Sequence, residues 1–317
     1  MTGSKKIDSL RKPCDFAKDI LNQCDFNEPP ICEKIITEYL GLSVIEIKDE
    51  NLQYYGNYNK ELIKSLEKAC AWKKRDEDGR STIYVYGETK YERKRLGIFH
   101  ECGHEVIPWH QNINYICTEN DISLITKKQI EREAFECGTE FLMPSDMFYN
   151  DINSLGTNIE SIKTLSSRYK SSIEATAIKY VRSHPGRCAL VMLEPINNYQ
   201  RRKKAHKGHL SNQINLTYDE KYNISLPVDS NTKYPLAVKY FVKSNRFEKF
   251  IRPGTGIGEN NPVYEAYTAQ QSNHMEIPAS SFGSSCKSCY RVDTLPFIKR
   301  EMTMLLLWIP YNQTSLF

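Results

Sequence analysis

Residues 96–104 have the sequence LGIFHECGH and contain the pattern His-Glu-x-x-His, with His100 and His104 four residues apart. On a helix, residues i and i+4 lie on the same face one turn apart, so the two imidazoles can bind one metal ion. Glu101 is offset by about 100° around the helix axis, close enough to act on a water at that metal but poorly placed as a ligand. This arrangement predicts a zinc-dependent hydrolase of peptide bonds.

The pattern is short, and the alternative interpretation is a surface helix with polar residues. The predicted helix extends from about Glu92 to Val106 and ends before Pro108. Leu96 and Ile107 fall on the same face as both histidines, so this face is predicted to be buried. Two histidines at ligand spacing on such a face favour a metal site over a solvated surface.

The third protein ligand has to come from another part of the chain, because a catalytic zinc takes three protein ligands and leaves one position for water. His110 lies six residues after His104, which is the spacing of the third histidine in the extended metzincin motif. That motif has a glycine where this chain has Ile107. His110 is therefore the less favoured candidate.

A second predicted helix, over residues 126–143 and ended by Pro144, supplies the preferred candidate, Glu131. Its apolar stripe consists of Ala134, Phe135, Gly138, Phe141 and Leu142. Glu131 is the carboxylate on this stripe, and a buried carboxylate is costly unless it is paired or binds a metal. Glu133 is the second choice, and a Glu131 that reaches solvent from the edge of the stripe is the alternative interpretation.

The composition predicts a cytoplasmic protein. The chain has 317 residues, of which 40% are hydrophobic and 26% charged, enough for one large or two ordinary domains. Ten cysteines are scattered along it, which indicates free thiols in a reducing compartment. The first residues lack the apolar segment of a signal peptide, and no run reaches the ~18 apolar residues of a membrane span. No membrane partner is expected.

The net charge is +4, and residues 201–207 alone contain five basic side chains. The rest of the chain is therefore close to neutral, unlike a dedicated nucleic-acid-binding protein. We interpret the basic run as a solvated linker, and no nucleic acid partner is expected.

Further elements are predicted before the motif. Helices follow Pro13 and Pro29-Pro30, a strand covers residues 42–47, and a helix covers residues 62–69. A hairpin with strands near residues 69–73 and 81–86 precedes the motif helix. The exposed edge of such a strand can hold an extended substrate by main-chain hydrogen bonds, and the alternative is a purely structural hairpin.

Two segments together resemble the ImmA/IrrE family of metallo-endopeptidases, namely residues 99–104 (FHECGH) and residues 131–144 (EREAFECGTEFLMP). The family pattern is His-Glu-x-x-His, followed by Glu-x-Glu-Ala-Asn-x-Phe-Ala-x-x-Leu-Leu-Met-Pro. The resemblance covers residues 14–185. It implies an α+β protein whose zincin-like peptidase core combines helices with a small sheet.

By this resemblance, His100, His104 and Glu131 bind one catalytic Zn²⁺ and Glu101 is the general base. The implied partner is a protein substrate, a helix-turn-helix transcriptional repressor cut in a stress or mobile-element response. The oligomeric state is not predicted. Phe135 stands where the family has an asparagine that orients a histidine ligand, and Cys137 and Gly138 also depart from the pattern.

We predict a zincin-like domain over residues 1–153, a helix-turn-helix-like helical segment over 154–186, and a β-rich C-terminal domain over 187–317. Strand-like runs near residues 188–193, 236–242 and 302–309 support the last of these. Some family members carry a sensor-like domain there.

Two alternative functions stay open. One is a regulatory protein that binds DNA or protein and has a vestigial metal site, which Phe135 and the basic run favour. The other is a metal-dependent toxin that shares the chemistry but acts on a different protein.

Overall fold

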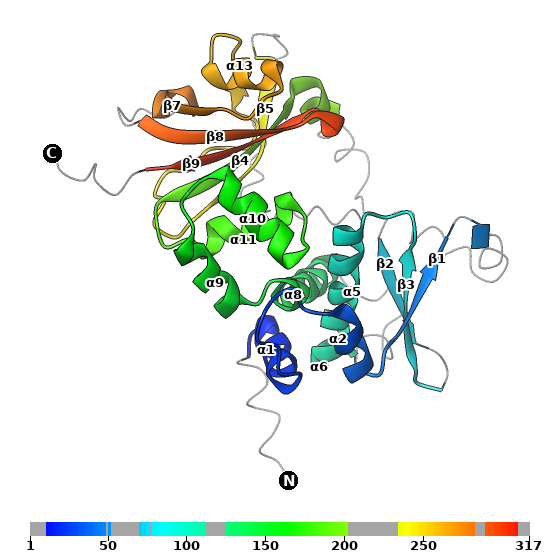
Figure 1. Cartoon of the computed structure of the whole chain (residues 1–317). Helices are drawn as coiled ribbons and strands as arrows, with labels where there is room; N and C mark the ends of the chain where they lie inside the picture. Colours follow the sequence, from blue (N-terminus) through cyan, green and yellow to red (C-terminus); the bar gives the residue numbers. More distant parts are fainter. Residues whose placement is uncertain are drawn as a thin grey trace. The chain divides into compact units, whose positions relative to one another are not determined.

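The structure is a computed structural model of the chain, shown in Figure 1. It describes residues 11–48, 50–51, 70–75, 78–111, 124–201, 234–282 and 289–309. Two compact units are present, one formed by residues 1–150 with 166–172 and the other by residues 151–165 with 173–317. The helix predicted over 62–69 and, except for Arg201, the basic run lie outside the described residues.

The first unit combines helices with a small sheet. Its helices are α1 (Pro13–Gln23), α2 (Glu33–Tyr39), α5 (Tyr91–Val106), α6 (Pro108–Gln111) and α8 (Leu124–Leu142), and its strands are β1 (Ser43–Ile47), β2 (Ala71–Arg75) and β3 (Ser81–Tyr86). Helix α5 contacts α8 along one side and the strands β2 and β3 along another, as Figure 1 shows. The motif helix is therefore the central element of this unit.

The small sheet has the order β1-β3-β2, with β1 parallel and β2 antiparallel to β3. Strand β3 is the second strand of the predicted hairpin, and it is hydrogen-bonded on both sides. It therefore has no edge for a substrate, and our prediction that its edge could hold one is wrong. The missing information was the pairing of β1, a long-range contact that no local pattern encodes.

Arg95, one turn before the first motif histidine, ties several segments of the first unit together. Its side chain is 1% exposed, and its Nε donates to the Glu33 carboxylate at 3.0 Å. Its terminal nitrogens donate to the carbonyl oxygens of Tyr169 at 2.6 Å and Lys170 at 3.1 Å, and to that of Ile31. Since Lys170 has a positive φ of 49°, Arg95 binds the carbonyls exposed where the preceding helix ends.

The second unit is built around a six-stranded sheet of order β6-β5-β4-β9-β8-β7, in which all neighbours are antiparallel. Its strands are β4 (Cys188–Pro195), β5 (Leu236–Lys243), β6 (Gly256–Ile257), β7 (His274–Pro278), β8 (Cys289–Phe297) and β9 (Met302–Trp308). Its helical elements are α11 (Ile173–Ser183), α13 (Pro262–Ala269), η3 (Ala279–Phe282) and η4 (Ile298–Arg300). Helices α9 (Ser145–Ser154) and α10 (Ile159–Tyr169) have residues in both units.

Both faces of this sheet are covered, so its central strands are mostly apolar, with Glu194 of β4 and Thr303 of β9 as buried polar exceptions. Ala189, Val191 and Leu193 of β4 pack in one cluster with Val263 of α13. The intervening residues of β4 point to the opposite face, because side chains alternate along a strand, and α11 contacts β4 and β5. Helix α11 (Ile173–Ser183), the second helix of the predicted helix-turn-helix-like segment, thus packs on this sheet as part of the core of the unit.

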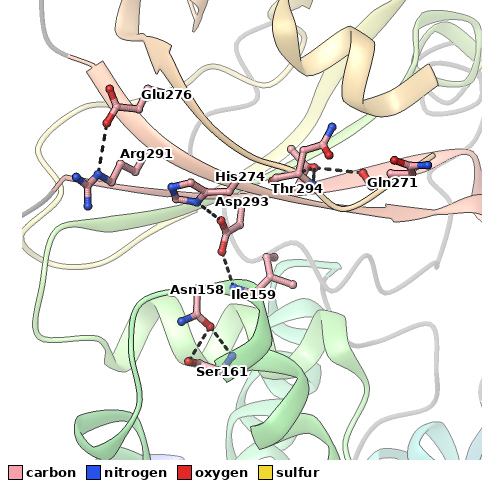
Figure 2. A network of polar contacts seen from close by, with 10 residues as sticks. Asn158, Ile159, Ser161, Gln271, His274, Glu276, Arg291, Asp293 and Thr294 are labelled. Atoms are coloured by element: carbon pink, nitrogen blue, oxygen red, sulfur yellow. Dashed lines mark hydrogen bonds and ion pairs between the residues drawn. The ribbon is translucent and has the colours of Figure 1, made fainter. Parts of the chain in front are cut away.

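A network of polar contacts links strands β7 and β8 to the start of α10, as Figure 2 shows. Asp293 of β8 accepts from the backbone N–H of Ile159 at 2.9 Å and lies 2.7 Å from Nδ1 of His274. The Asn158 side chain accepts from the backbone N–H of Ser161 at 2.8 Å. Two side chains therefore satisfy N–H groups at the N-terminus of α10, and Asp293 also places a favourable negative charge there.

The predicted α+β class with a β-rich C-terminal part is confirmed, and those predicted helices and strands that fall in the described residues lie within a few residues of the observed ones. The sequence patterns missed the helices α6, α9 and α13 and the strands β6, β7 and β8. In the described part of the chain, no helix has the length and apolar character needed to cross a membrane. The predicted boundaries at 153/154 and 186/187 stay a prediction.

Candidate metal centre

The site lies where α5 and α8 cross, and two glycines allow the helices to approach closely. A Cβ added to Gly103 would lie 2.6 Å from the carbonyl oxygen of Ala134. A Cβ added to Gly138 would lie 2.8 Å from the backbone nitrogen of His100. Neither position has room for a side chain. Gly138, which departs from the family pattern, is therefore part of what brings α8 against the first motif histidine.

The side chains of His100, His104 and Glu131 converge at this crossing. One ligand atom from each residue lies within 4.8 Å of the other two. Among the described residues, this is the group of three or more His, Cys, Asp or Glu side chains that could bind a metal ion. Oε2 of Glu131 is 3.2 Å from Nε2 of His100 and 3.7 Å from Nε2 of His104. The three residues chosen from the sequence thus meet in space, and their role as ligands stays a prediction.

The spacing and chemistry of the three groups fit a tetrahedral metal. Ligands about 2.0–2.2 Å from a tetrahedral zinc are about 3.3–3.6 Å from one another, close to the two distances to Glu131. Two imidazoles and one carboxylate are also a donor set that catalytic zinc sites use. The side chains are partly buried, with 15%, 17% and 28% of their surface exposed in chain order, so a ligand position can stay open to water.

The electrostatics of the cluster favour a cation between these groups. Burial would lower the pKa of His100, but its hydrogen bond to Glu131 and the charges of Glu101 and Glu131 outweigh it and raise that pKa. Burial would raise the pKa of Glu131, yet hydrogen bonds to His100 and His104 hold it well below its ordinary value. Both shifts show that the cluster favours positive charge next to the Glu131 carboxylate, where a divalent cation would fit.

Glu101 is buried on α5, next to His100 and outside the group of three. Burial chiefly raises the pKa of the Cys70 thiol, just before β2, and the charge of Glu101 adds to this shift. Within the described ranges, no hydrogen bond or ion pair engages it. A carboxylate on a largely buried residue, not tied up in a hydrogen bond or ion pair, is available to act as a base.

The two less favoured ligand candidates, His110 and Glu133, lie behind His104. Nδ1 of His110 is 3.2 Å from Nδ1 of His104, and Nε2 of His110 is 3.1 Å from Oε2 of Glu133. Burial lowers the pKa of His110 to about 4, so this imidazole is neutral. Both side chains contact the site without joining the convergent group.

Neighbouring cysteines are unsuited to act as ligands or nucleophiles. Cys102 lies within the motif and Cys137 lies on α8, and both are buried. Burial raises the pKa of each thiol, whereas metal ligands and nucleophiles are thiolates. Their role is to pack between the helices.

The burial of α5 differs from our prediction. Residues 97–99 and 101–103 are buried, whereas Leu96, His100 and His104 are only partly so. The histidine face is thus the more open face of a helix that is covered on its other sides. On α8, Glu140 is also buried, with its carboxylate bound to the backbone N–H and hydroxyl of Ser145. Glu131 was therefore not the only buried-face carboxylate of this helix.

The sequence analysis also missed two anchors of the site. Glu105, next to His104, pairs with Lys73 at 2.8 Å and Arg75 at 3.2 Å and so fixes β2 to α5. The other anchor is Arg95. A charged residue four positions before Phe99 on an otherwise apolar stripe was the signal that could have revealed it.

Residues 38–180 match the family model of the IrrE N-terminal-like domain, a peptidase family designated M78. This match confirms the resemblance to the ImmA/IrrE family and supports a metallopeptidase-type function. No curated protein matches the chain. A solved structure titled "Mycobacterium tuberculosis transcriptional regulator" is similar with a TM-score of 0.49 and 11% identity, covering 93% of this chain and 75% of that one.

Proposed function

We propose that this chain, which carries an IrrE N-terminal-like domain, is a zinc-dependent endopeptidase that hydrolyses a peptide bond in a protein substrate. The observation that carries the proposal is the convergence of His100, His104 and Glu131 beside the buried carboxylate of Glu101. Three ligands with a general base on the same helix are the parts that metal-assisted hydrolysis requires.

When bound, the cation acts as a Lewis acid toward the scissile carbonyl and makes water reactive at neutral pH. Glu101 takes the proton of the attacking water and transfers it to the nitrogen of the leaving amine. Because Glu101 has no partner among the described residues, no hydrogen bond has to break before it accepts that proton. The three ligand side chains keep their positions because α5 and α8 are fixed to each other.

The substrate backbone fits the outer edge of β2. Strand β2 is paired with β3 on one side, and in the described part of the chain no strand pairs with the other side. Strand β2 contacts α5, and its Lys73 pairs at 2.8 Å with Glu105, the residue after His104, so the strand passes near the cluster. An extended peptide added to this edge would present its carbonyl groups beside the metal ligands.

The substrate we propose is a helix-turn-helix transcriptional repressor, and the setting is a stress or mobile-element response. This part rests on the resemblance of the two motif segments to the ImmA/IrrE family. The chain would act in the cytoplasm, where such repressors are found. Cleavage at one site would separate the repressor's DNA-binding part from the rest.

The test is to express the full chain and its Glu101→Gln variant and to compare newly formed protein N-termini in the cell. We expect wild-type protein to contain near-stoichiometric zinc and to generate a small set of new N-termini, including one in a DNA-binding repressor. Glu101→Gln should keep the metal and lose these cleavages, because only the base has changed. General acid–base catalysis contributes about 10²–10⁴-fold, so purified variant should be slower by that factor.

A zinc-containing wild-type protein that generates no new N-termini would instead favour a regulatory protein with a vestigial site. New N-termini confined to proteins unrelated to transcription would favour a metal-dependent toxin. Equal cleavage by wild type and Glu101→Gln would contradict the assignment of the base.

A further inference from the structure

A continuous series of hydrogen bonds extends behind His104, away from the ligand cluster. Nδ1 of His104 faces Nδ1 of His110 at 3.2 Å, and Nε2 of His110 faces Oε2 of Glu133 at 3.1 Å. The side chain of His110 is 1% exposed and that of Glu133 13% exposed. The series therefore lies in the interior, where the geometry of hydrogen bonds is well defined.

The end of the series is fixed by further donors. Glu133 also accepts from Nε1 of Trp109 at 2.6 Å and from the amide of Gln129 at 2.8 Å. Trp109 packs edge-to-face on Phe16 of α1, with ring centroids 5.6 Å apart. The carboxylate is thus held by donors from α6 and α8, and α6 is held against α1.

The donor and acceptor roles along the series follow from the position of Glu133. An ionised carboxylate only accepts, so Nε2 of His110 carries a hydrogen and donates it. An imidazole with its single hydrogen on Nε2 accepts at Nδ1, and among the described residues the group that faces Nδ1 of His110 is Nδ1 of His104, which then carries the hydrogen. With its hydrogen on Nδ1, His104 presents the lone pair of Nε2 toward Glu131, as a metal ligand must.

We propose that His110 and Glu133 are positioning residues that fix the tautomer and ring orientation of the metal ligand His104. They perform here the role that the asparagine has in the family pattern, where this chain has Phe135. Phenylalanine has no hydrogen-bonding atom, so residue 135 cannot supply that contact. This inference rests on the proposed function to the extent that His104 must be a ligand.

The same geometry excludes His110 as the third ligand in place of Glu131. Both of its ring nitrogens are engaged, one by His104 and the other by Glu133. Binding a metal through either nitrogen would break the series and leave a buried polar atom without its partner, which is costly.

The first test measures the zinc affinity of the full-length protein by competition with a chromophoric chelator. We expect His110→Ala to weaken zinc binding about 10–100-fold, the usual effect of removing a group that orients a ligand. Glu133→Gln keeps an acceptor for His110 and should weaken binding less than His110→Ala. Glu92→Gln, on the same helix as the ligands but outside the series, and His274→Ala, in the other unit, are the matched controls and should bind zinc as wild type does.

The second test uses nitrogen NMR of histidine-labelled, zinc-loaded protein, which distinguishes the two neutral tautomers and the cation. We expect His104 with its hydrogen on Nδ1 and His110 with its hydrogen on Nε2. In Glu133→Leu, the His110 tautomer should lose this preference while the protein stays folded.

Several outcomes would overturn the inference. The first is that His110→Ala binds zinc as tightly as wild type does. The second is that NMR finds the hydrogen of His110 on Nδ1. The third is that His110→Ala loses its metal completely while Glu131→Ala keeps it. Wild-type protein that binds no metal would overturn the proposed function as well, so the two failures can be told apart.

Discussion

The two units of this protein bury very different side chains. Among the described residues, the buried charged or imidazole side chains of the first unit are Arg95, Glu101, His110 and Glu140, and that of the second unit is Glu194. The first unit thus keeps ionisable groups inside, around α5, at a cost in stability. The second unit has a mostly apolar sheet, in which Glu194 is the charged side chain that the described residues bury. We therefore expect catalysis in the first unit, because it buries several ionisable groups. The sheet of the second unit is expected to have a structural role only, as a scaffold.

The largest effect on stability should come from Arg95→Met, which breaks the anchor of the first unit. Glu33 and three backbone carbonyls would lose their partner. Removing one partner from a buried charged group costs about 3–5 kcal/mol. We expect the free energy of unfolding to fall by this amount, which unfolding in urea would measure. Arg80→Met, whose side chain is 84% exposed, is the control and should stay within about 0.5 kcal/mol of wild type. Equal stability of both variants would show that the buried guanidinium is not an anchor.

A core truncation in the second unit should cost nearly as much and leave the metal site unchanged. Leu305 of β9 is fully buried in the sheet. We expect Leu305→Ala to lower the free energy of unfolding by about 2–5 kcal/mol, with wild-type zinc affinity at a temperature where the variant is folded. Leu305→Met should lose less than about 1.5 kcal/mol, because the volume is kept. A weakened zinc affinity in Leu305→Ala would contradict the view that the sheet is only a scaffold.

Gly138→Ala tests whether helix spacing sets the site. The new methyl group would press on the backbone of His100, and α8, which carries Glu131, would have to move away. We expect a loss of about 1–3 kcal/mol in stability, as for other overpacked interiors, together with weaker zinc binding. The larger Gly138→Ser should be worse in both measurements. Unchanged zinc affinity in both variants would mean that the crossing does not position the third ligand.

The smallest effect should come from the polar rim of the second unit. His274, whose side chain is 60% exposed, pairs with Asp293, and an exposed pair contributes little. We expect His274→Ala to change stability by at most about 0.5 kcal/mol. Asp293→Ala should cost more, about 0.5–2 kcal/mol, because Asp293 also binds the N-terminus of α10. A larger loss in His274→Ala than in Asp293→Ala would contradict this assignment.

The sequence predicted the elements whose information is local. The helix periods around His100 and Glu131 placed three potential ligands on two helices, and ligand chemistry then favoured Glu131 over His110. Strand β8 could have been found as well, since Tyr290, Val292 and Thr294 are buried and alternate with more exposed residues. The charged residues of β8 made this alternation of buried and exposed positions hard to recognise in the sequence.

The rest depended on contacts between distant segments. The partners of Arg95 are mainly backbone carbonyls, and no side-chain pattern marks those. The central place of β3 depends on β1, and the role of His110 depends on where Glu133 lies after the helices cross. We predicted the wrong buried face for α5. Because this helix is covered on several sides, one stripe of apolar residues in its sequence does not identify the face that lies in the interior.

The most direct test of the metal centre is the metal content of purified wild-type protein compared with the His100→Ala, Glu131→Ala and Glu101→Gln variants. The arrangement of the site predicts near-stoichiometric zinc in wild type and Glu101→Gln, and its loss in His100→Ala and Glu131→Ala. Retention of zinc by Glu131→Ala, together with its loss from His110→Ala or Glu133→Ala, would contradict the ligand set.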